Sequence, residues 1–272
     1  MPPSLCPGDI LGLLIVKLGG SVITDKHSPF KVRRKVVKRL AHELKSAREP
    51  LILIHGGGSF GHPLASKYGI ANGYRSKTQL MGLSLTHGAM EQLNVEVVGA
   101  LQKAGLPAMA VQPSSCMVVD GGRIRHMELV PIRKLLELGM IPVLYGDAVP
   151  DISQGMSILS GDQIASYLAR ELRASRVIMG VDVDGVYRKG RKNSKRVEII
   201  RRITPDDEKL LSSLGTAGKG DVTGGMRNKV RELLEAAKEG IEAEIVNASK
   251  PGVLERAIRG KRGLGTVISG RR

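Results

Sequence analysis

The chain has 272 residues, no tryptophan, two phenylalanines and a formal net charge of +16. Its length allows a substantial core in one large domain or two small ones, and that core must be built from aliphatic side chains. No apolar run approaches the ~20 residues that span a bilayer, and the N-terminus lacks the basic leader of a signal peptide, so we expect no membrane partner. Two cysteines without metal or redox spacing favour a cytoplasmic location.

The positive charge raises the question of nucleic-acid binding. Lys and Arg are spread along the chain, however, and the densest run, Arg188–Arg196, reads as a solvated loop. No aromatic residues are interleaved with it for base stacking. We therefore expect no nucleic-acid partner, and a field that attracts small anionic substrates.

Apolar strands and amphipathic helices alternate from the N-terminus onward. Leu13–Val16 reads as a buried strand, a helix-spaced apolar pattern covers 32–44, and Leu51–Ile54 reads as a second strand. The pattern then predicts a helix, a strand, a hairpin, a helix and a strand, in that order: Ser76–Ala104, Ala108–Val111, Val118–Ile124, Val130–Leu138 and Ile141–Tyr145.

The C-terminal part continues the alternation. Capping-box spacing over Ser160–Gln163 predicts a helix over Gln163–Ala174. A strand, a helix, a strand, a helix and a strand follow: Arg176–Val181, Thr223 to about Glu239, Glu244–Asn247, Val253–Arg259 and Gly265–Ile268. The alternation predicts an α/β fold around a mainly parallel sheet. A soft boundary near residue 175 divides an N-terminal lobe, 1–175, from a C-terminal lobe, 176–272, and the two lobes share that sheet.

A triple glycine directly follows the second strand, in the segment HGGGSFGH over His55–His62. Glycines let the backbone approach a ligand closely, and their N–H groups suit phosphate oxygens. The alternative is a glycine-rich turn at the surface, and the two flanking histidines favour a site. The spacing G-x-G-x-x-G also matches the dinucleotide-binding fingerprint. The acidic residue which that fingerprint needs is missing, since no Asp or Glu lies between Glu49 and Glu91.

Three more glycine-containing turns follow apolar strands, at Lys17–Ser21, Gly146-Asp147 and Asp182–Gly185. Because ligands bind at the carboxyl ends of strands in open parallel sheets, we expect all four turns at one edge of the sheet. Their lysine, histidine, serine and aspartate side chains suit phosphate handling. The sequence contains no P-loop and no protein-kinase motif set.

Three charged residues are candidates for the chemistry, and two of them, Lys17 and Asp162, have a simpler alternative. Lys17 ends a buried strand, where it either neutralises a transferring phosphoryl group or extends to solvent. Lys229 lies one turn into a helix with a Gly-Gly start that could receive a phosphate. Asp162 lies in the first turn of its helix, where capping alone would explain it.

Taken in order, the motifs resemble the amino acid kinase superfamily over nearly the whole chain after about residue 13. They are KLGGS, HGGG, GD, SGDQ, DVDGVY and TGGM…K, which begin at Lys17, His55, Gly146, Ser160, Asp182 and Thr223. HGGGSFGH, which ends at His62, and ITDK, which ends at Lys26, resemble the isopentenyl phosphate kinases of that superfamily. Fosfomycin-kinase-like relatives carry a similar histidine.

The resemblance implies a three-layer αβα sandwich, an acceptor-binding N-terminal lobe, a nucleotide-binding C-terminal lobe, ATP and Mg²⁺ as cofactors, and a homodimer. It implies ATP-dependent phosphorylation of isopentenyl phosphate to isopentenyl diphosphate. Lys26 would stabilise the transition state and Asp162 would orient the lysines. The nucleotide would be held by Lys17, Gly19, Gly20, Ser21, Gly58, Asp182, Gly225 and Lys229, and the acceptor phosphate by Gly57, His62 and Gly161. No residue is assigned as a metal ligand.

The chemistry of this assignment is self-consistent. A phosphate monoester has a second pKa of about 6, so it is largely dianionic near neutral pH and needs no general base. Two alternatives remain: a kinase of the same fold for another phosphate or phosphonate such as fosfomycin, and a non-catalytic nucleotide-binding regulator. A hydrocarbon tail would need an apolar pocket, for which the helix over Ser76–Ala104 is a candidate wall, although its Met81, Leu83, Leu85, Met90 and Leu93 equally suit an ordinary core.

Overall fold

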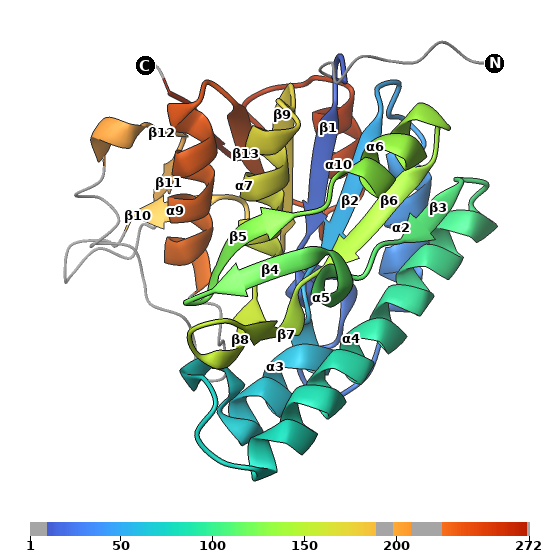
Figure 1. The fold of residues 1–272 in the computed structure, drawn as a ribbon. Helices are drawn as coiled ribbons and strands as arrows, with labels where there is room; N and C mark the ends of the chain where they lie inside the picture. Colours follow the sequence, from blue (N-terminus) through green and yellow to red (C-terminus); the bar gives the residue numbers. More distant parts are fainter. Residues whose placement is uncertain (1–9, 189–197, 208–224, 271–272) are drawn as a thin grey trace.

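The computed structural model describes residues 10–188, 198–207 and 225–270 (Figure 1). The expected basic loop after Arg188 and the expected helix start at Thr223 lie outside the described residues.

An eight-stranded sheet forms the centre of the molecule, with the strand order β12-β14-β13-β9-β1-β2-β6-β3. Within this sheet the described pairs are parallel, except that β14 runs antiparallel to β13. The mainly parallel α/β sheet is therefore confirmed. The strands are β1 (Leu14–Leu18), β2 (Leu51–His55), β3 (Ala108–Ala110), β6 (Ile141–Tyr145), β9 (Arg176–Val181), β12 (Arg202–Ile203), β13 (Glu242–Asn247) and β14 (Thr266–Ile268).

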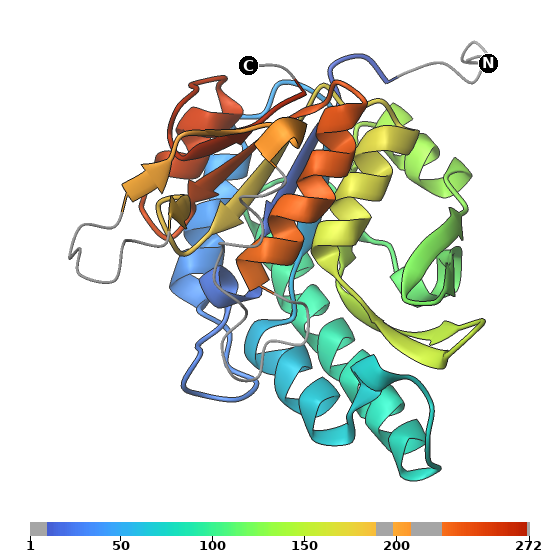
Figure 2. The same cartoon turned by 90° about the vertical axis from the view of Figure 1, so that its left-hand side faces the viewer.

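Helices cover both faces of the sheet, which gives the three layers (Figures 1 and 2). One face packs against α6 (Val130–Glu137), α7 (Gly161–Glu171) and α9 (Gly225–Lys238). The other packs against α1 (Gly20–Ile23), α2 (Arg34–Leu44), α4 (Thr78–Lys103) and α10 (Val253–Ile258). None of the helices in the described ranges is long and apolar enough to cross a membrane.

Alternation along the central strand decides which layer each side chain enters. Ile15 packs in the core beneath α7 and α9, whereas Leu14 and Val16 pack beneath α2 and α4. Successive side chains of a strand point to opposite faces. Lys17 therefore emerges on the same face as Ile15. The expected strand ended at Val16, but β1 continues to Leu18, so this lysine belongs to the strand itself.

Two elements differ from the expectation. The segment after His55 reads as a turn, but α3 (Gly58–Tyr68) begins inside it and contains Pro63. Proline has no N–H for the carbonyl four residues earlier. That carbonyl belongs to Ser59, and it accepts the N–H of Phe30 at 3.3 Å instead, so the helix keeps both its proline and its satisfied backbone.

The second difference is a hairpin, β7 (Asp147–Asp151) and β8 (Gly155–Leu159), which the sequence analysis did not predict. Its turn is held by the Asp151 carboxylate, which accepts N–H groups from Ser153 and Gln154 within the turn. The same carboxylate accepts the N–H groups of Gly121 and Gly122 in the expected hairpin of β4 (Met117–Asp120) and β5 (Arg123–Met127). The second hairpin thus depends on a contact distant in sequence.

The remaining described elements are short: α5 (Pro113–Cys116), β10 (Val186–Arg188), β11 (Glu198–Ile200), and the 3₁₀ turns η1 (Ile70–Asn72) and η2 (Pro205–Asp207). Four sheet strands come from residues 1–175 and four from 176–272, and the two sets meet at the β1–β9 pair. The division of binding tasks between two lobes stays a prediction.

Candidate active site

A cleft of about 1010 Å³ opens where β1, β2 and β9 end and where α3, α7 and α9 begin. It has contributions from all four glycine-containing turns, so their expected gathering at one sheet edge is confirmed. All the residues that the sequence assigns to substrate and cofactor line this one cleft: Lys17, Gly19, Gly20, Ser21, Lys26, Gly57, Gly58, His62, Gly161, Asp162, Asp182, Gly225 and Lys229.

The floor of the cleft holds two lysines on one carboxylate. Lys17 Nζ lies 2.7 Å from Asp162 Oδ1, and Lys229 Nζ lies 2.8 Å from both oxygens of the same carboxylate. The three side chains are between 7% and 9% exposed. They come from β1, α7 and α9, which are brought together because Lys17 points to the face that these two helices cover.

The buried cluster carries one net positive charge when all three groups are ionised. Burial by itself would raise the pKa of Asp162, but the two ammonium groups outweigh it and hold that pKa far below its usual range. Burial, with a contribution from the charge of Lys17, lowers the pKa of Lys229 to about 8 against the attraction of Asp162. The cluster is therefore a ready site for an anion.

The simple capping role considered for Asp162 belongs to its neighbour. Ser160 Oγ accepts the Gln163 N–H at 3.1 Å and caps α7, as the capping-box spacing predicts. The Asp162 carboxylate is thereby left to the two lysines.

A second lysine–carboxylate pair lies at the open side of the cleft. Lys26 Nζ lies 2.5 Å from Asp182 Oδ2, and Ser21 Oγ donates to Asp182 Oδ1 at 2.9 Å. Partial burial would raise the pKa of Asp182, but the hydrogen bonds from Lys26 and Ser21 outweigh it, so the pKa is lowered. The Lys26 side chain is 59% exposed, which allows its ammonium group to reorient toward a ligand.

The glycines of the first two turns are required by close packing of backbone on backbone. A Cβ on Gly20 would lie 2.1 Å from the Gly58 nitrogen. Gly58 itself has φ = +48°, a left-handed conformation that glycine adopts without strain. The turn after β1 and the start of α3 thus touch each other, and no larger residue fits at either position.

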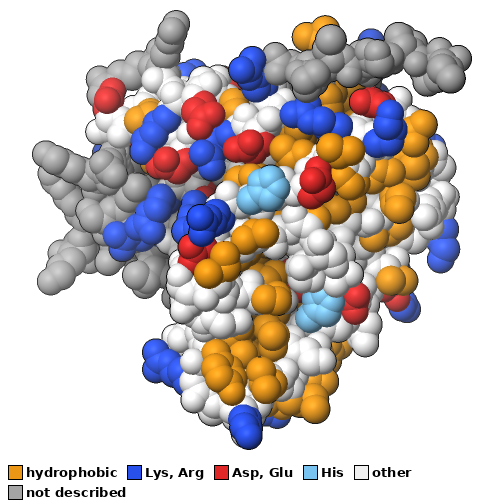
Figure 3. Space-filling view, viewed as in Figure 1, with side chains coloured by type: hydrophobic (Ala, Val, Ile, Leu, Met, Phe, Trp, Pro, Cys, Tyr) orange, Lys and Arg blue, Asp and Glu red, His pale blue; other side chains and the backbone are white. Residues whose placement is uncertain are grey.

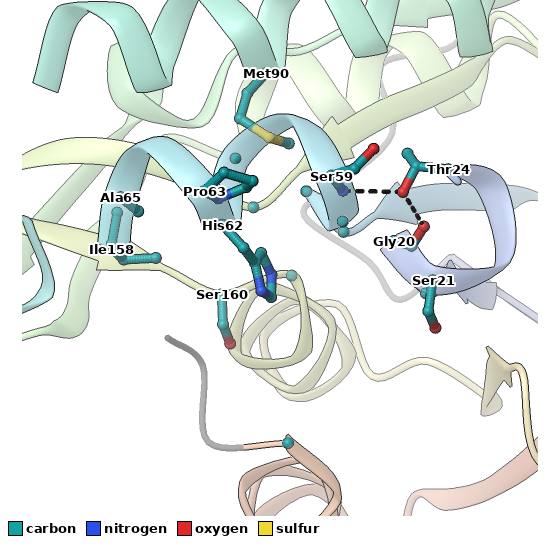
Figure 4. Close-up of a pocket in the computed structure, with 18 of the residues that line it drawn as sticks. Gly20, Ser21, Thr24, Ser59, His62, Pro63, Ala65, Met90, Ile158 and Ser160 are labelled. Atoms are coloured by element: carbon teal, nitrogen blue, oxygen red, sulfur yellow. Dashed lines mark hydrogen bonds between the residues drawn. The ribbon is translucent and has the colours of Figure 1, made fainter. Parts of the chain in front are cut away.

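The end of the cleft beside α3 changes from polar to apolar. His62 projects from α3 toward the start of α7, where Ser160 lies (Figure 4). Ala65, Met90 and Ile158 line the cleft on the same side of the molecule. Of the five apolar candidates from the long helix, Met90 alone is among the cleft-lining residues that the structure describes. Leu93 is core, Leu83 packs against a small separate cluster, and Met81 and Leu85 are exposed.

Two residues from the glycine-containing turns have other tasks. His55 is fully buried, its Nε2 lies 3.1 Å from Asn94 Nδ2, and its ring stacks on Tyr145. Burial lowers the pKa of His55 to about 4, so it is neutral and structural. Asp147 lines the cleft, but its carboxylate bonds His87 Nδ1 at 2.9 Å. The position of a residue directly after a strand does not show whether its side chain points into the core or into the cleft.

The sequence analysis did not assign Thr24, Ser59 or Ser160 to the site, although all three line it. All three lie inside the quoted motifs, but a motif does not show which group a hydroxyl will contact where that group comes from a segment distant in sequence.

The described residues contain no group of three or more His, Cys, Asp and Glu side chains that could hold a metal ion. Both aspartates assigned to the site, Asp162 and Asp182, are already paired with lysines. This donor set suits a cation that arrives on phosphate oxygens and does not suit a cage made by the protein alone.

Comparison with known proteins gives a consistent picture. Residues 12–247 match the amino acid kinase family model. The isopentenyl phosphate kinase of Methanothermobacter thermautotrophicus is 41% identical over 267 residues, which cover 95% of this chain and 100% of that protein. A solved isopentenyl phosphate kinase structure superposes with a TM-score of 0.82 at 38% identity, covering 94% of this chain and 100% of the other. The product complex of the T. acidophilum isopentenyl phosphate kinase gives a TM-score of 0.73 at 27% identity, covering 94% and 99%.

Proposed function

Because this chain belongs to the amino acid kinase family, and within it to the isopentenyl phosphate kinases, we propose that it transfers the γ-phosphoryl group of ATP to isopentenyl phosphate. The product is isopentenyl diphosphate. The observation that carries this proposal is the single cleft in which buried lysines, two glycine turns, a histidine and an apolar end are joined.

The demands of the reaction match this arrangement. The acceptor is a dianion near neutral pH and is already a nucleophile, so the enzyme must bring two anions together in line and spread their charge. Lys17 and Lys229 supply positive charge at the floor, and the exposed Lys26 supplies it from the open side. Asp162, tied to both buried lysines, orients them and does not act as a base.

Each ligand has its own part of the cleft in this proposal. The donor phosphates lie on the turn over Gly19–Ser21 and on Gly58, with Asp182 and Gly225 beside the nucleotide. The acceptor phosphate lies between Gly57, His62 and Gly161, and its hydrocarbon tail points toward Met90, Ala65 and Ile158. This order places the tail beside the apolar residues Ala65, Met90 and Ile158 and the phosphates beside the lysines and glycine turns.

Mg²⁺ fits this site as a companion of ATP. When bound to the triphosphate, it neutralises charge on the transferring group. Asp182, which is paired with the exposed Lys26, would face such an ion once Lys26 turns to the phosphates. The lysines and glycine N–H groups of the chain provide the rest of the anion binding.

The test is ADP release from Mg²⁺-ATP with a panel of acceptors: isopentenyl phosphate, dimethylallyl phosphate, fosfomycin, uridine monophosphate, N-acetylglutamate and no acceptor. We expect a strong preference for isopentenyl phosphate. Turnover with fosfomycin alone would keep the kinase chemistry and refute the isoprenoid acceptor. A chain that binds ATP and turns over none of the acceptors would be a regulator.

His62→Ala sharpens this test, because the proposal assigns His62 to the acceptor phosphate alone. We expect turnover of isopentenyl phosphate to fall severely while ATP affinity stays nearly unchanged. His126→Ala is the matched control, since His126 lies exposed on β5 and outside the cleft. Unchanged acceptor kinetics in His62→Ala would remove the histidine from this role.

We also propose that the chain forms a homodimer through α4. Met81 and Val95 on this helix are 61% and 71% exposed, and a Cβ added to Gly88 or Gly99 would meet no atom within 4 Å. Hydrophobic side chains reach the surface where α4 begins (Figure 3). Exposed apolar patches commonly mark interaction sites, and surface glycines let a second helix approach closely.

Val95→Arg tests this interface. We expect light scattering to show a dimer for the wild type and a monomer for the variant, and an unaltered mass would refute the interface.

A cytoplasmic location is part of the same proposal. It is supported by the low cysteine count and by the free thiol of Cys116. Cell fractionation tests it.

A further inference from the structure

Thr24 occupies the contact between the two glycine turns. Thr24 follows α1 directly and is 1% exposed. Thr24 Oγ1 donates to the Gly20 carbonyl at 2.8 Å and accepts the Ser59 N–H at 3.0 Å (Figure 4). One hydroxyl group therefore joins the turn after β1 to the first turn of α3.

The two segments pack so closely at this contact that no side-chain atom could be added to Gly58. A Cβ on Gly58 would lie 2.1 Å from Thr24 Oγ1 and 2.7 Å from the Gly20 oxygen. The Thr24 N–H also donates to the Gly20 carbonyl, at 2.9 Å, so backbone and side chain hold the same acceptor. The Ser59 N–H is one of the donors that a helix leaves unpaired at its N-terminus, and here another segment satisfies it.

The two segments that Thr24 joins hold different ligands in the proposed function. The turn after β1 carries the donor phosphates, with Gly58 beside it, whereas Gly57 and His62 of the α3 segment carry the acceptor phosphate. Transfer requires the reacting atoms at a fixed separation, and a misplacement of about 1 Å slows such a reaction by on the order of 100-fold.

We propose that Thr24 is a positioning residue, whose hydroxyl group sets the spacing between the donor-phosphate turn and the acceptor-phosphate helix. The inference rests on the proposed function for the identity of the two ligands, and on the geometry above for the link. Thr24 touches neither reacting atom in this proposal. It acts through Gly20 and Ser59.

Thr24→Val tests the hydroxyl with little change in shape, and Thr24→Ser restores the hydroxyl while removing the methyl group. We expect kcat with isopentenyl phosphate to fall on the order of 100-fold in Thr24→Val, with KM for ATP and for the acceptor each changed less than about threefold. Thr24→Ser should recover kcat to within about threefold of the wild type, by the same reasoning. Thr24→Ala provides a second deletion of the hydroxyl where the valine variant does not fold.

Thr266→Val is the matched control. Thr266 Oγ1 also bridges two segments, donating to the Ile200 carbonyl at 2.6 Å and accepting the Val186 N–H at 2.8 Å. It is fully buried and lies outside the cleft lining. Its loss should lower the melting temperature as Thr24→Val does, and leave the kcat of the folded enzyme within about twofold of the wild type, since Thr266 holds neither the turn after β1 nor the start of α3.

Three outcomes would overturn the positioning role: a Thr24→Val enzyme with wild-type kcat, a defect confined to KM, or a Thr24→Ser enzyme as slow as Thr24→Val. Failure of the proposed function looks different, because it appears in the wild type. A wild type that transfers phosphate to another acceptor refutes the isoprenoid assignment, and the Thr24 comparison is then run with that acceptor. A wild type that transfers phosphate to no acceptor overturns both.

Discussion

The cleft contains two lysine–carboxylate groups that differ in burial. Asp162 and its two lysines are less than 10% exposed, whereas Asp182 is 27% and its partner Lys26 is 59% exposed. Removing ions from water costs several kcal/mol each, and close pairing offsets this only while every partner is present. An exposed pair contributes little, between about 0 and 1 kcal/mol, and it exchanges readily with solvent. The first group is built into the fold, and the second is free to rearrange.

The two groups interact differently with an anionic ligand. The buried cluster keeps an excess positive charge at a fixed place before any ligand arrives, so its reorganisation on binding is small. The exposed pair is electrically balanced, and it offers Lys26 to the ligand only when the contact with Asp182 is released.

Asp162→Asn should have the largest effect, because it leaves two buried ammonium groups without a counter-charge. We expect the free energy of unfolding to fall by about 3–5 kcal/mol at neutral pH, and turnover to be nearly abolished. ATP should stabilise this variant more than the wild type, since its phosphates replace the lost negative charge. Urea denaturation with and without ATP measures both effects. A loss below about 1 kcal/mol would contradict the buried-cluster interpretation.

Lys17→Met should separate chemistry from stability. Asp162 keeps Lys229 as a partner in this variant, so the loss of stability should be smaller than in Asp162→Asn. We expect kcat to fall about 10²–10³-fold with every acceptor, because a preorganised charge at the transferring group is lost. Lys134→Met, on the exposed face of α6, serves as the control. A fully active Lys17→Met enzyme would place Lys17 outside the reaction.

Lys229→Arg should alter the pH dependence. Since burial lowers the pKa of Lys229 to about 8, the charged form that binds phosphate is lost as the pH rises through about 8 in the free enzyme. We expect kcat/KM for ATP to decline above that pH in the wild type. An arginine stays charged, so the variant should lack this alkaline decline even where its overall activity is lower. Profiles of kcat/KM for ATP from about pH 6 to 10 in both enzymes measure this difference. The same decline in both enzymes would assign it to another group.

Asp182→Asn should have the smallest effect on stability. Its lysine partner is largely in solvent, so we expect the free energy of unfolding to change by less than about 1 kcal/mol. KM for ATP should still change, because the variant removes the negative charge that holds Lys26 away from the phosphates. A loss of stability as large as that of Asp162→Asn would end the contrast between the two groups.

Local patterns were sufficient for most elements of the fold. The strands around Ile15, Ile54 and Val143 are continuous apolar runs, as expected where helices cover both faces of a parallel sheet. The glycine-containing turns after them belong to one cleft because parallel strands end at a common edge. The helix at Gly58 and the hairpin at Asp151 were missed, since each is stabilised by groups distant in sequence.

Periodicity and turn chemistry along the chain were enough to predict the parallel sheet, the edge at which the motifs gather and the residue types that meet phosphate. The partners of individual side chains follow from the tertiary structure. The resemblance implied that Asp162 orients the lysines, but the direct contact of its carboxylate with both of them, the burial of His55 and the Thr24 link between two turns are visible only in the structure. Such pairings depend on the close approach of segments remote in sequence, and a linear pattern contains no record of that approach.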